Sequence, residues 1–128
     1  MAATGTTQLP FSSRSLRTAR HELMTFLAQH GVRTVVANDA LLVLGELAAN
    51  AVRHGAPRDD GTFEARWVLR DEILVLSVHD GGDSGTVHVL HVDESAVSGR
   101  GLAIVDLLAD RWWIERDSGT RISAELTV

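Results

Sequence analysis

Apolar residues recur every three or four positions in three segments of the chain, and this period predicts three helices. The predicted spans, with the residues that end them, are Ser12 or Ser13 to His30 before Gly31, Asn38 to His54 before Gly55 and Pro57, and Leu102 to Asp110. Serine and asparagine side chains accept hydrogen bonds from the free N–H groups at a helix start, and glycine commonly ends a helix.

Alternating apolar and polar residues predict the strands of one sheet. The predicted strands are Thr62 to Leu69, Ile73 to Val78 with a turn at Asp71 and Glu72 before it, Trp112 to Arg116 and Thr120 to Leu126. Residues 1–13 are predicted to form an N-terminal tail with a short edge strand near Thr7 to Phe11. Residues 83–98 are predicted to form a connection with a short strand around Val87 to Val92.

This order of elements predicts the α+β class and one domain over residues 14–128. Because helices and strands each bury one apolar face, we expect a two-layer α/β sandwich, with the helices on one face of a mostly antiparallel mixed sheet.

The predicted central helix carries polar residues on one side of an otherwise apolar surface. Glu46, Asn50 and His54 follow one another at intervals of four residues, so at about 100° per residue they project from the same side. The apolar residues of the other side are Leu41, Leu44, Leu47, Ala48, Ala51 and Val52. This pattern favours a largely buried helix whose C-terminal end borders a pocket. The alternative is a surface helix with an ordinary polar face.

Composition and charge narrow the classes of function. The 128 residues include no cysteine and begin with a polar segment rather than an apolar leader, which is typical of a cytoplasmic protein. We expect no membrane span and, at a net charge of −5, no direct binding to nucleic acid. All 12 basic residues are arginine, so a phosphate site of the Walker type, which needs lysine, is excluded.

Two glycine-containing turns provide further candidate binding residues. Asp80 ends a buried strand two residues before Gly82, where a carboxylate could accept a hydrogen bond from the amine of a bound base. The segment Gly99-Arg100-Gly101-Leu102 precedes a helix, and free N–H groups at a helix start favour phosphate. An ordinary Asp-Gly turn and a flexible helix cap are the alternatives.

Taken together in this order, the motifs resemble the N, G1 and G2 boxes and the terminal Gly-Thr of the GHKL (histidine-kinase-like) ATP-binding fold, also called the Bergerat fold. They are Glu46-x3-Asn50-x3-His54, Asp80-x-Gly82, Gly99-x-Gly101-Leu102 and Gly119-Thr120. Within that superfamily the chain is most similar to the small stand-alone anti-sigma factor serine/threonine kinases of high-GC Gram-positive bacteria, through LLVLGELAANAVRHG and SGRGLAIVDLLADRW.

The resemblance implies ATP and Mg²⁺ as cofactors and gives each motif residue a role. Asn50 would coordinate Mg²⁺, Asp80 would hold the adenine amine next to Gly82, and Thr120 would contact the base through water. The residues that would wrap the phosphates are Gly99, Arg100, Gly101 and Leu102. Arg53 and His54 complete the cofactor-binding set at the end of the central helix.

Glu46 is the candidate catalytic residue, because a carboxylate can polarise a serine hydroxyl for phosphoryl transfer. The resemblance therefore implies an anti-sigma factor serine kinase that binds a sigma factor, phosphorylates a STAS-domain anti-anti-sigma protein and forms a homodimer.

The first predicted helix offers either a partner surface or an ordinary solvated face, formed by Arg14, Arg17, Arg20 and His21. The alternative function is a non-catalytic ATP-binding switch module. Glutamate at position 46 disfavours the ATPase domain of a histidine kinase.

Two features depart from the family pattern. Ser84 stands where the G1 box usually has its last glycine. His88 and His91 have a spacing that could suggest a metal site, but on an extended segment the two side chains would point to opposite faces.

Overall fold

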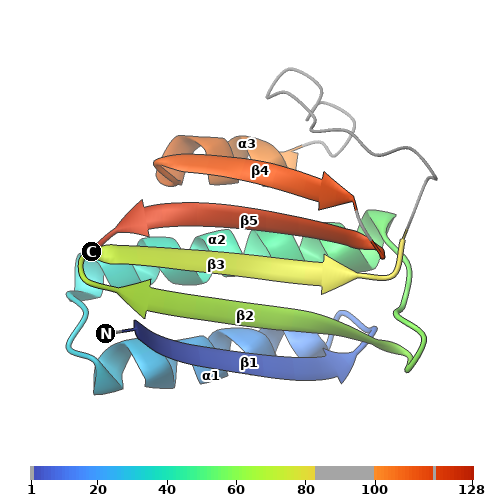
Figure 1. Ribbon diagram of the computed structural model, residues 1–128, viewed down its shortest axis with the longest axis horizontal. Coiled ribbons are helices and arrows are strands. Elements are labelled where there is room, and N and C mark those ends of the chain that lie inside the picture. The colour runs from blue at the N-terminus through green and yellow to red at the C-terminus, as the bar shows by residue number, and fades with distance from the viewer. Residues whose placement is uncertain (1, 83–99, 117) are drawn as a thin grey trace.

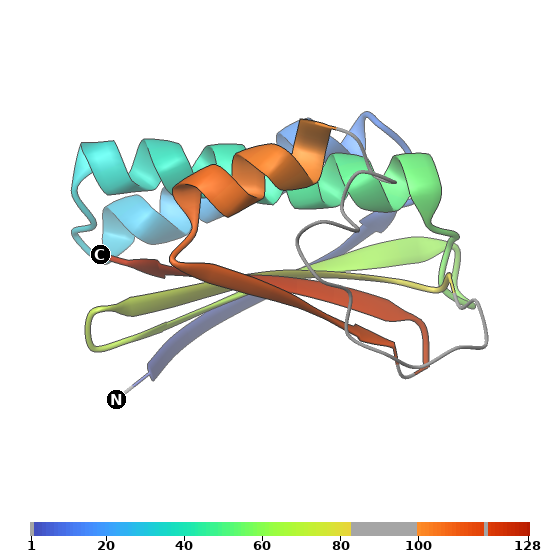
Figure 2. The ribbon, with the colours of Figure 1, turned by 90° about the horizontal axis from the view of Figure 1, so that it is seen from above.

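The structure of the protein is a computed structural model that describes residues 2–82, 100–116 and 118–128, without the side chains of residues 100 and 101. The described residues form the elements β1 (Ala2–Pro10), α1 (Ser15–Gln29), α2 (Thr34–His54), β2 (Thr62–Arg70), β3 (Ile73–Asp80), α3 (Arg100–Leu108), β4 (Arg111–Arg116) and β5 (Thr120–Thr127). Figures 1 and 2 show the three helices on one face of the sheet and the other face without a helix. The predicted α+β sandwich is confirmed.

The sheet has the strand order β1-β2-β3-β5-β4, and each neighbouring pair is antiparallel. The described strands therefore make a purely antiparallel sheet and not the mixed sheet that the sequence predicted. Asp71 and Glu72 connect β2 to β3 as predicted, and Asp71 has a φ of 56° in this turn. Since β3 and β5 are central neighbours, the C-terminal end of β3 lies beside the start of β5.

The core lies between the sheet and the helices (Figure 2), and α2 lies between α1 and α3 in the helical layer (Figure 1). Leu44 and Leu47 of α2 and Phe63 of β2 have no exposed surface. Burying an apolar side chain of this size stabilises a fold by about 1.5–3 kcal/mol. The core residues of α2 are Val36, Ala40, Val43, Leu44, Leu47, Ala48 and Ala51. Leu41 and Val52, which the pattern placed in the core, are half-buried at its margin.

The start of α2 and the length of β1 differ from the sequence predictions. The helix begins at Thr34, one turn before the expected cap at Asn38. Val36 is buried in that extra turn, so packing outweighs the weak helix preference of Thr and Val there. The edge strand covers Ala2–Pro10 instead of a few residues near Thr7. Its inward positions are mostly small residues, which give a faint apolar pattern.

By length and composition α2 could cross a membrane, since its most apolar window has a mean hydropathy of 1.5. A single helix of this kind is weak evidence for a membrane span. Half of that window is buried inside the domain, as is usual for the core helix of a globular protein.

Three features of the sequence analysis lie outside the described residues. They are the predicted strand around Val87 to Val92, Ser84 and the His88–His91 pair.

Candidate functional site

The C-terminal ends of α2 and β3 and the start of β5 lie at the same end of the sandwich (Figures 1 and 2). Asp80 is the last residue of β3 and pairs with Thr120, the first residue of β5. The antiparallel register therefore brings the Asp80 motif next to the Gly119-Thr120 motif, although 39 positions separate Asp80 from Gly119 in the chain. The loop that follows α2 covers the Asp80 carboxylate.

Asp80 is a buried acid held by backbone N–H groups. It is 4% exposed, and its Oδ1 accepts hydrogen bonds from the N–H of Gly82 at 2.6 Å and of Ala56 at 3.4 Å. Burial raises the pKa of the Asp80 carboxyl above its usual value, because water is removed from the charged form. The two N–H groups, and the charges of His79 and Arg116, oppose this shift without reversing it.

Gly55 is a site residue that sequence reasoning missed. It ends α2, and a methyl group at this position would lie 2.5 Å from the Asp80 carboxyl carbon. Its φ of −91° is open to any residue, so space rather than backbone conformation requires glycine here. The local pattern predicts only a helix stop at Gly55, because nothing in it shows that a carboxylate 25 residues away packs against this glycine.

Hydrogen bonds join the turn after β3 to its two neighbours. Thr120 Oγ1 donates to the backbone oxygen of Gly82 at 2.7 Å, and Gly81 N–H donates to the backbone oxygen of Ala56 at 2.8 Å. Gly82 therefore lies between β5 and the end of α2, next to Asp80. A methyl group on Gly82 would approach Asp80 Oδ1 to 2.8 Å, which explains why a glycine stands there.

The polar residues of α2 have different surroundings. Asn50 Oδ1 is buried and has no hydrogen-bond partner among the described residues. Such an unpaired buried oxygen is costly, and a cation or a donor group of a ligand would satisfy it. Glu46 is half-buried and makes no hydrogen bond or ion pair with any described residue. Arg53 and His54 are exposed on the last turn.

The glycine turn before α3 is described only in part. Gly99 lies outside the described residues, and the backbone of Arg100 and Gly101 forms the first turn of α3. Leu102 is 1% exposed in the core, so its side chain anchors the helix and only its backbone could face a ligand. α3 packs beside α2 on the same face of the sheet, and α2 is the helix that carries Asn50.

The described site thus combines a buried carboxylate, an unpaired carboxamide oxygen and a nearby helix start. A carboxylate can accept a hydrogen bond from the amine of a base, a carboxamide oxygen is a suitable ligand for a hard cation, and a helix start favours phosphate. No group of three His, Cys, Asp or Glu side chains that could hold a metal ion occurs in the described part of the chain. A cation here would therefore need ligand oxygens beside that of Asn50.

Comparison with known proteins places the chain in a family. It matches a crystal structure of the RsbU and RsbW domains of Rv1364c from Mycobacterium tuberculosis, with a TM-score of 0.75 and 22% sequence identity. The match covers 98% of this chain and 32% of that one, so this chain spans about a third of its length. No curated protein matches the chain. The sequence model of the histidine kinase-like ATPase domain matches residues 9–126, and the chain therefore belongs to the histidine kinase-like ATPase domain family.

Proposed function

We propose that the protein is an ATP-dependent regulatory kinase of the anti-sigma factor type. The observation that carries the proposal is the buried Asp80 carboxylate, which accepts two backbone N–H groups at the end of β3 and packs closely against two glycines, Gly55 and Gly82. A carboxylate that is kept buried against its own desolvation cost is typical of a binding site and not of an ordinary turn.

Asp80 is proposed to recognise the adenine base. Its Oδ1 already accepts two backbone N–H groups, which leaves Oδ2 as the acceptor for the exocyclic amine of adenine. Guanine has an oxygen at the corresponding ring position, and two facing acceptors repel each other. The site should therefore prefer ATP to GTP.

Asn50 is proposed to hold Mg²⁺ through its buried Oδ1. Since the described residues offer no further cluster of metal ligands, the remaining ligands would come from the ATP phosphates and water, as is common for Mg²⁺. When bound, the ion supplies charge that neutralises the phosphates. Arg53, His54 and the turn from Gly99 to Leu102 complete the proposed phosphate side.

Glu46 is the proposed general base for a serine hydroxyl. It lies one helical turn before Asn50, on the same side of α2, and no ion pair with a described residue neutralises it. The proposed substrate is a STAS-domain anti-anti-sigma protein, and the proposed second partner is a sigma factor. The fold similarity to a structure that includes an RsbW domain agrees with this class. A homodimer and a cytoplasmic location, with no direct contact to nucleic acid or membrane, belong to the same proposal.

Titration calorimetry with ATP and GTP tests the binding part of this proposal. We expect ATP to bind in a Mg²⁺-dependent manner and more tightly than GTP. Asp80→Asn should weaken ATP binding at least tenfold and reduce the preference for ATP, because a carboxamide can donate to the guanine oxygen. Asp59→Asn, an exposed neighbour, is the matched control. Unchanged ATP affinity in Asp80→Asn would refute the site.

A second comparison tests the metal role. Asn50→Ala should abolish most of the Mg²⁺ dependence of ATP binding without lowering the free energy of unfolding, since the buried Oδ1 has no hydrogen-bond partner among the described residues to lose. Asn38→Ala, on the exposed side of the same helix, should keep the full Mg²⁺ dependence.

Phosphoryl transfer separates the kinase from the alternative function, a non-catalytic ATP-binding switch module. The protein would be incubated with radiolabelled ATP and purified STAS-domain proteins, and labelled serine would be measured. The kinase predicts labelling that Glu46→Gln reduces by about 10²–10⁴-fold without loss of ATP binding, as expected for removal of a general base. Glu72→Gln at the opposite end of the sheet is the control. Tight ATP binding without labelling would favour the switch module.

A further inference from the structure

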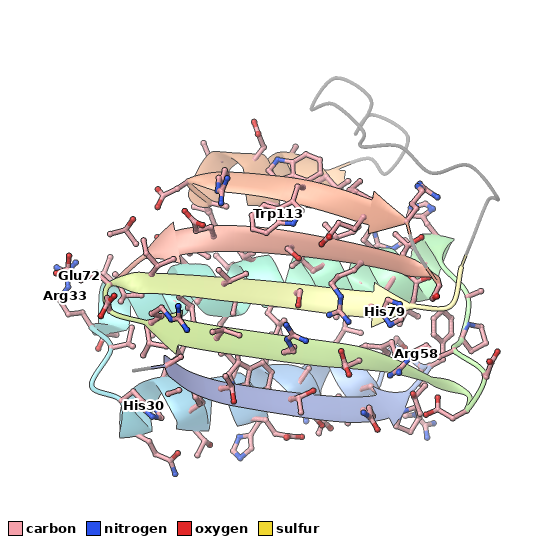
Figure 3. The ribbon with its side chains drawn as sticks, in the orientation of Figure 1. His30, Arg33, Arg58, Glu72, His79 and Trp113 are labelled. Carbon is pink, nitrogen blue, oxygen red and sulfur yellow. The ribbon has the colours of Figure 1, made fainter. Side chains whose placement is uncertain are left out.

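His79 is the direct neighbour of Asp80 but belongs to the other face of the sheet. Successive side chains of a strand point to opposite faces, so Asp80 faces the helices and His79 faces the open side. Figure 3 shows His79 at the same end of the sheet as Arg58. No role for this histidine is included in the proposed site.

The His79 ring is bonded to the turn between β4 and β5. Its Nε2 lies 3.0 Å from the backbone oxygen of Ser118. A carbonyl oxygen only accepts hydrogen bonds, so Nε2 must carry the proton. Ser118 has a φ of 56° and Gly119 a φ of 113°, conformations that the chain adopts only in a tight turn. The histidine therefore fixes a turn whose backbone is in an uncommon conformation.

The same turn is bonded to the end of β3 on the helical side. There, Thr120 Oγ1 donates to the Gly82 oxygen at 2.7 Å. Gly119 lies between the two bonds, and a methyl group on it would overlap the Asp80 backbone oxygen and lie 2.8 Å from His79 Nε2. The turn is thus held against β3 from both faces, with glycine as the residue that fits between.

We propose that His79 is a positioning residue for nucleotide binding. It acts through the Ser118 oxygen: with the turn fixed, Thr120 keeps Gly82 in place, and the Gly82 N–H in turn orients the Asp80 carboxylate. This inference rests on the proposed ATP site, because it concerns the orientation of the Asp80 carboxylate, which is proposed to bind the base. The histidine itself lies on the opposite face of the sheet and does not contact the nucleotide.

Two substitutions distinguish the contribution of the His79 hydrogen bond from that of the volume of the ring. His79→Leu fills similar space but cannot donate, whereas His79→Gln can place an amide N–H near the Ser118 oxygen. We expect His79→Leu to weaken ATP binding about tenfold, the loss expected when one hydrogen bond of the network is removed. His79→Gln should stay within about threefold of the unchanged protein, and His21→Leu, an exposed histidine of α1, should have no effect.

Nuclear magnetic resonance gives a readout that does not depend on the nucleotide. The Gly82 N–H donates to Asp80 over only 2.6 Å, so its proton should resonate at low field. This resonance should move upfield in His79→Leu and keep its position in His79→Gln. A merely structural role of the ring would lower the melting temperature in both variants and leave the signal of the folded molecules unchanged. His79→Asn, which is too short to reach Ser118, serves as the non-donating variant if His79→Leu does not fold.

The results for the Asp80 and His79 variants distinguish a failure of the positioning role from a failure of the proposed ATP site. If Asp80→Asn weakens ATP binding and the non-donating His79 variants do not, the positioning role is overturned and the proposed function stands. Equal losses in His79→Leu and His79→Gln would also overturn it, because the bond would then not be the cause. If Asp80→Asn itself has no effect, both proposals fall together.

Discussion

Asp80 combines two properties that oppose each other in a folded protein, burial and a charge that the proposed function needs. Its burial raises the pKa of the carboxyl, so the ionised side chain costs stability in the protein without nucleotide. A bound adenine amine would donate to the ionised form and offset part of this cost. The residue was recognisable in the sequence because a strand pattern ends there in a glycine turn.

The first prediction is that Asp80→Asn stabilises the nucleotide-free protein at neutral pH. In the folded state the carboxyl takes up a proton at a higher pH than the unfolded value of 3.8, so the native protein gains stability as the pH falls through the folded pKa towards 3.8. The advantage of the variant should therefore grow from acid to neutral pH and then level off. Chemical denaturation at several pH values measures it, and a constant difference would contradict the prediction.

The second prediction compares Gly55, which follows the last residue of α2, with Gly45 inside that helix. Gly55→Ala forces a methyl group onto the Asp80 carboxyl, so we expect a loss of about 1–3 kcal/mol in the free energy of unfolding, together with weaker ATP binding. Among the described residues outside its own helix, the methyl group of Gly45→Ala would contact the flexible Arg20 side chain, at 3.3 Å, so this variant should stabilise the protein by about 0.5–1 kcal/mol without affecting ATP binding. Thermal and chemical unfolding of both variants measure whether the change in the free energy of unfolding has opposite signs in the two.

At the scale of elements, periodicity predicted the helices and strands well wherever large apolar residues mark one face. The core of α2 and the hairpin of β4 and β5 follow directly from such patterns. The first turn of α2 and most of β1 did not, because β-branched residues in a helix and small residues in a strand carry a weak signal. The contact between Gly55 and Asp80 lay beyond any local pattern, since it depends on how α2 meets β3.

The third prediction concerns an ion pair that joins two strands across a third. Arg121 of β5 donates to Glu64 Oε1 of β2 at 3.1 Å, and His79 of β3 stands between them in the register. Burial raises the pKa of Glu64, but the hydrogen bond and charge of Arg121 outweigh it, and the net pKa is lowered. The stabilisation is therefore present above the unfolded value of 4.5 and is lost as the pH falls through the lowered folded pKa.

Glu64→Gln should accordingly cost about 1–2 kcal/mol at neutral pH and progressively less in acid. Denaturation curves between neutral and acid pH measure the difference. Glu115→Gln, an exposed residue on β4, is the matched control and should change stability by less than about 0.5 kcal/mol. A pH-independent loss in Glu64→Gln would contradict the ion-pair explanation.

At the scale of the whole molecule, the two edge strands of the described sheet differ in charge. β1 covers Ala2–Pro10 and contains no charged residue, whereas β4 carries Arg111, Glu115 and Arg116. Charged side chains discourage the pairing of an edge strand with another chain, and β1 lacks this protection. The proposed homodimer therefore has its most suitable contact along β1.

The fourth prediction is that Thr6→Lys, at an exposed position of β1, shifts the protein towards the monomer. A lysine on each copy would place like charges at the paired edges, which is unfavourable. Sedimentation equilibrium measures the mass of both proteins at equal concentration. Glu115→Lys on the opposite edge is the control, and an equal dissociation in that variant would place the contact elsewhere.

The unequal edges also constrain the symmetry of any assembly built by strand pairing. When an edge pairs with the same edge of a second copy, the contact is isologous: a two-fold axis relates the copies and both β1 edges are used up. Growth into a filament would require β1 of one copy to pair with β4 of the next, and the charges of β4 oppose that contact. A single uncharged edge thus permits a closed pair and disfavours an open-ended fibre.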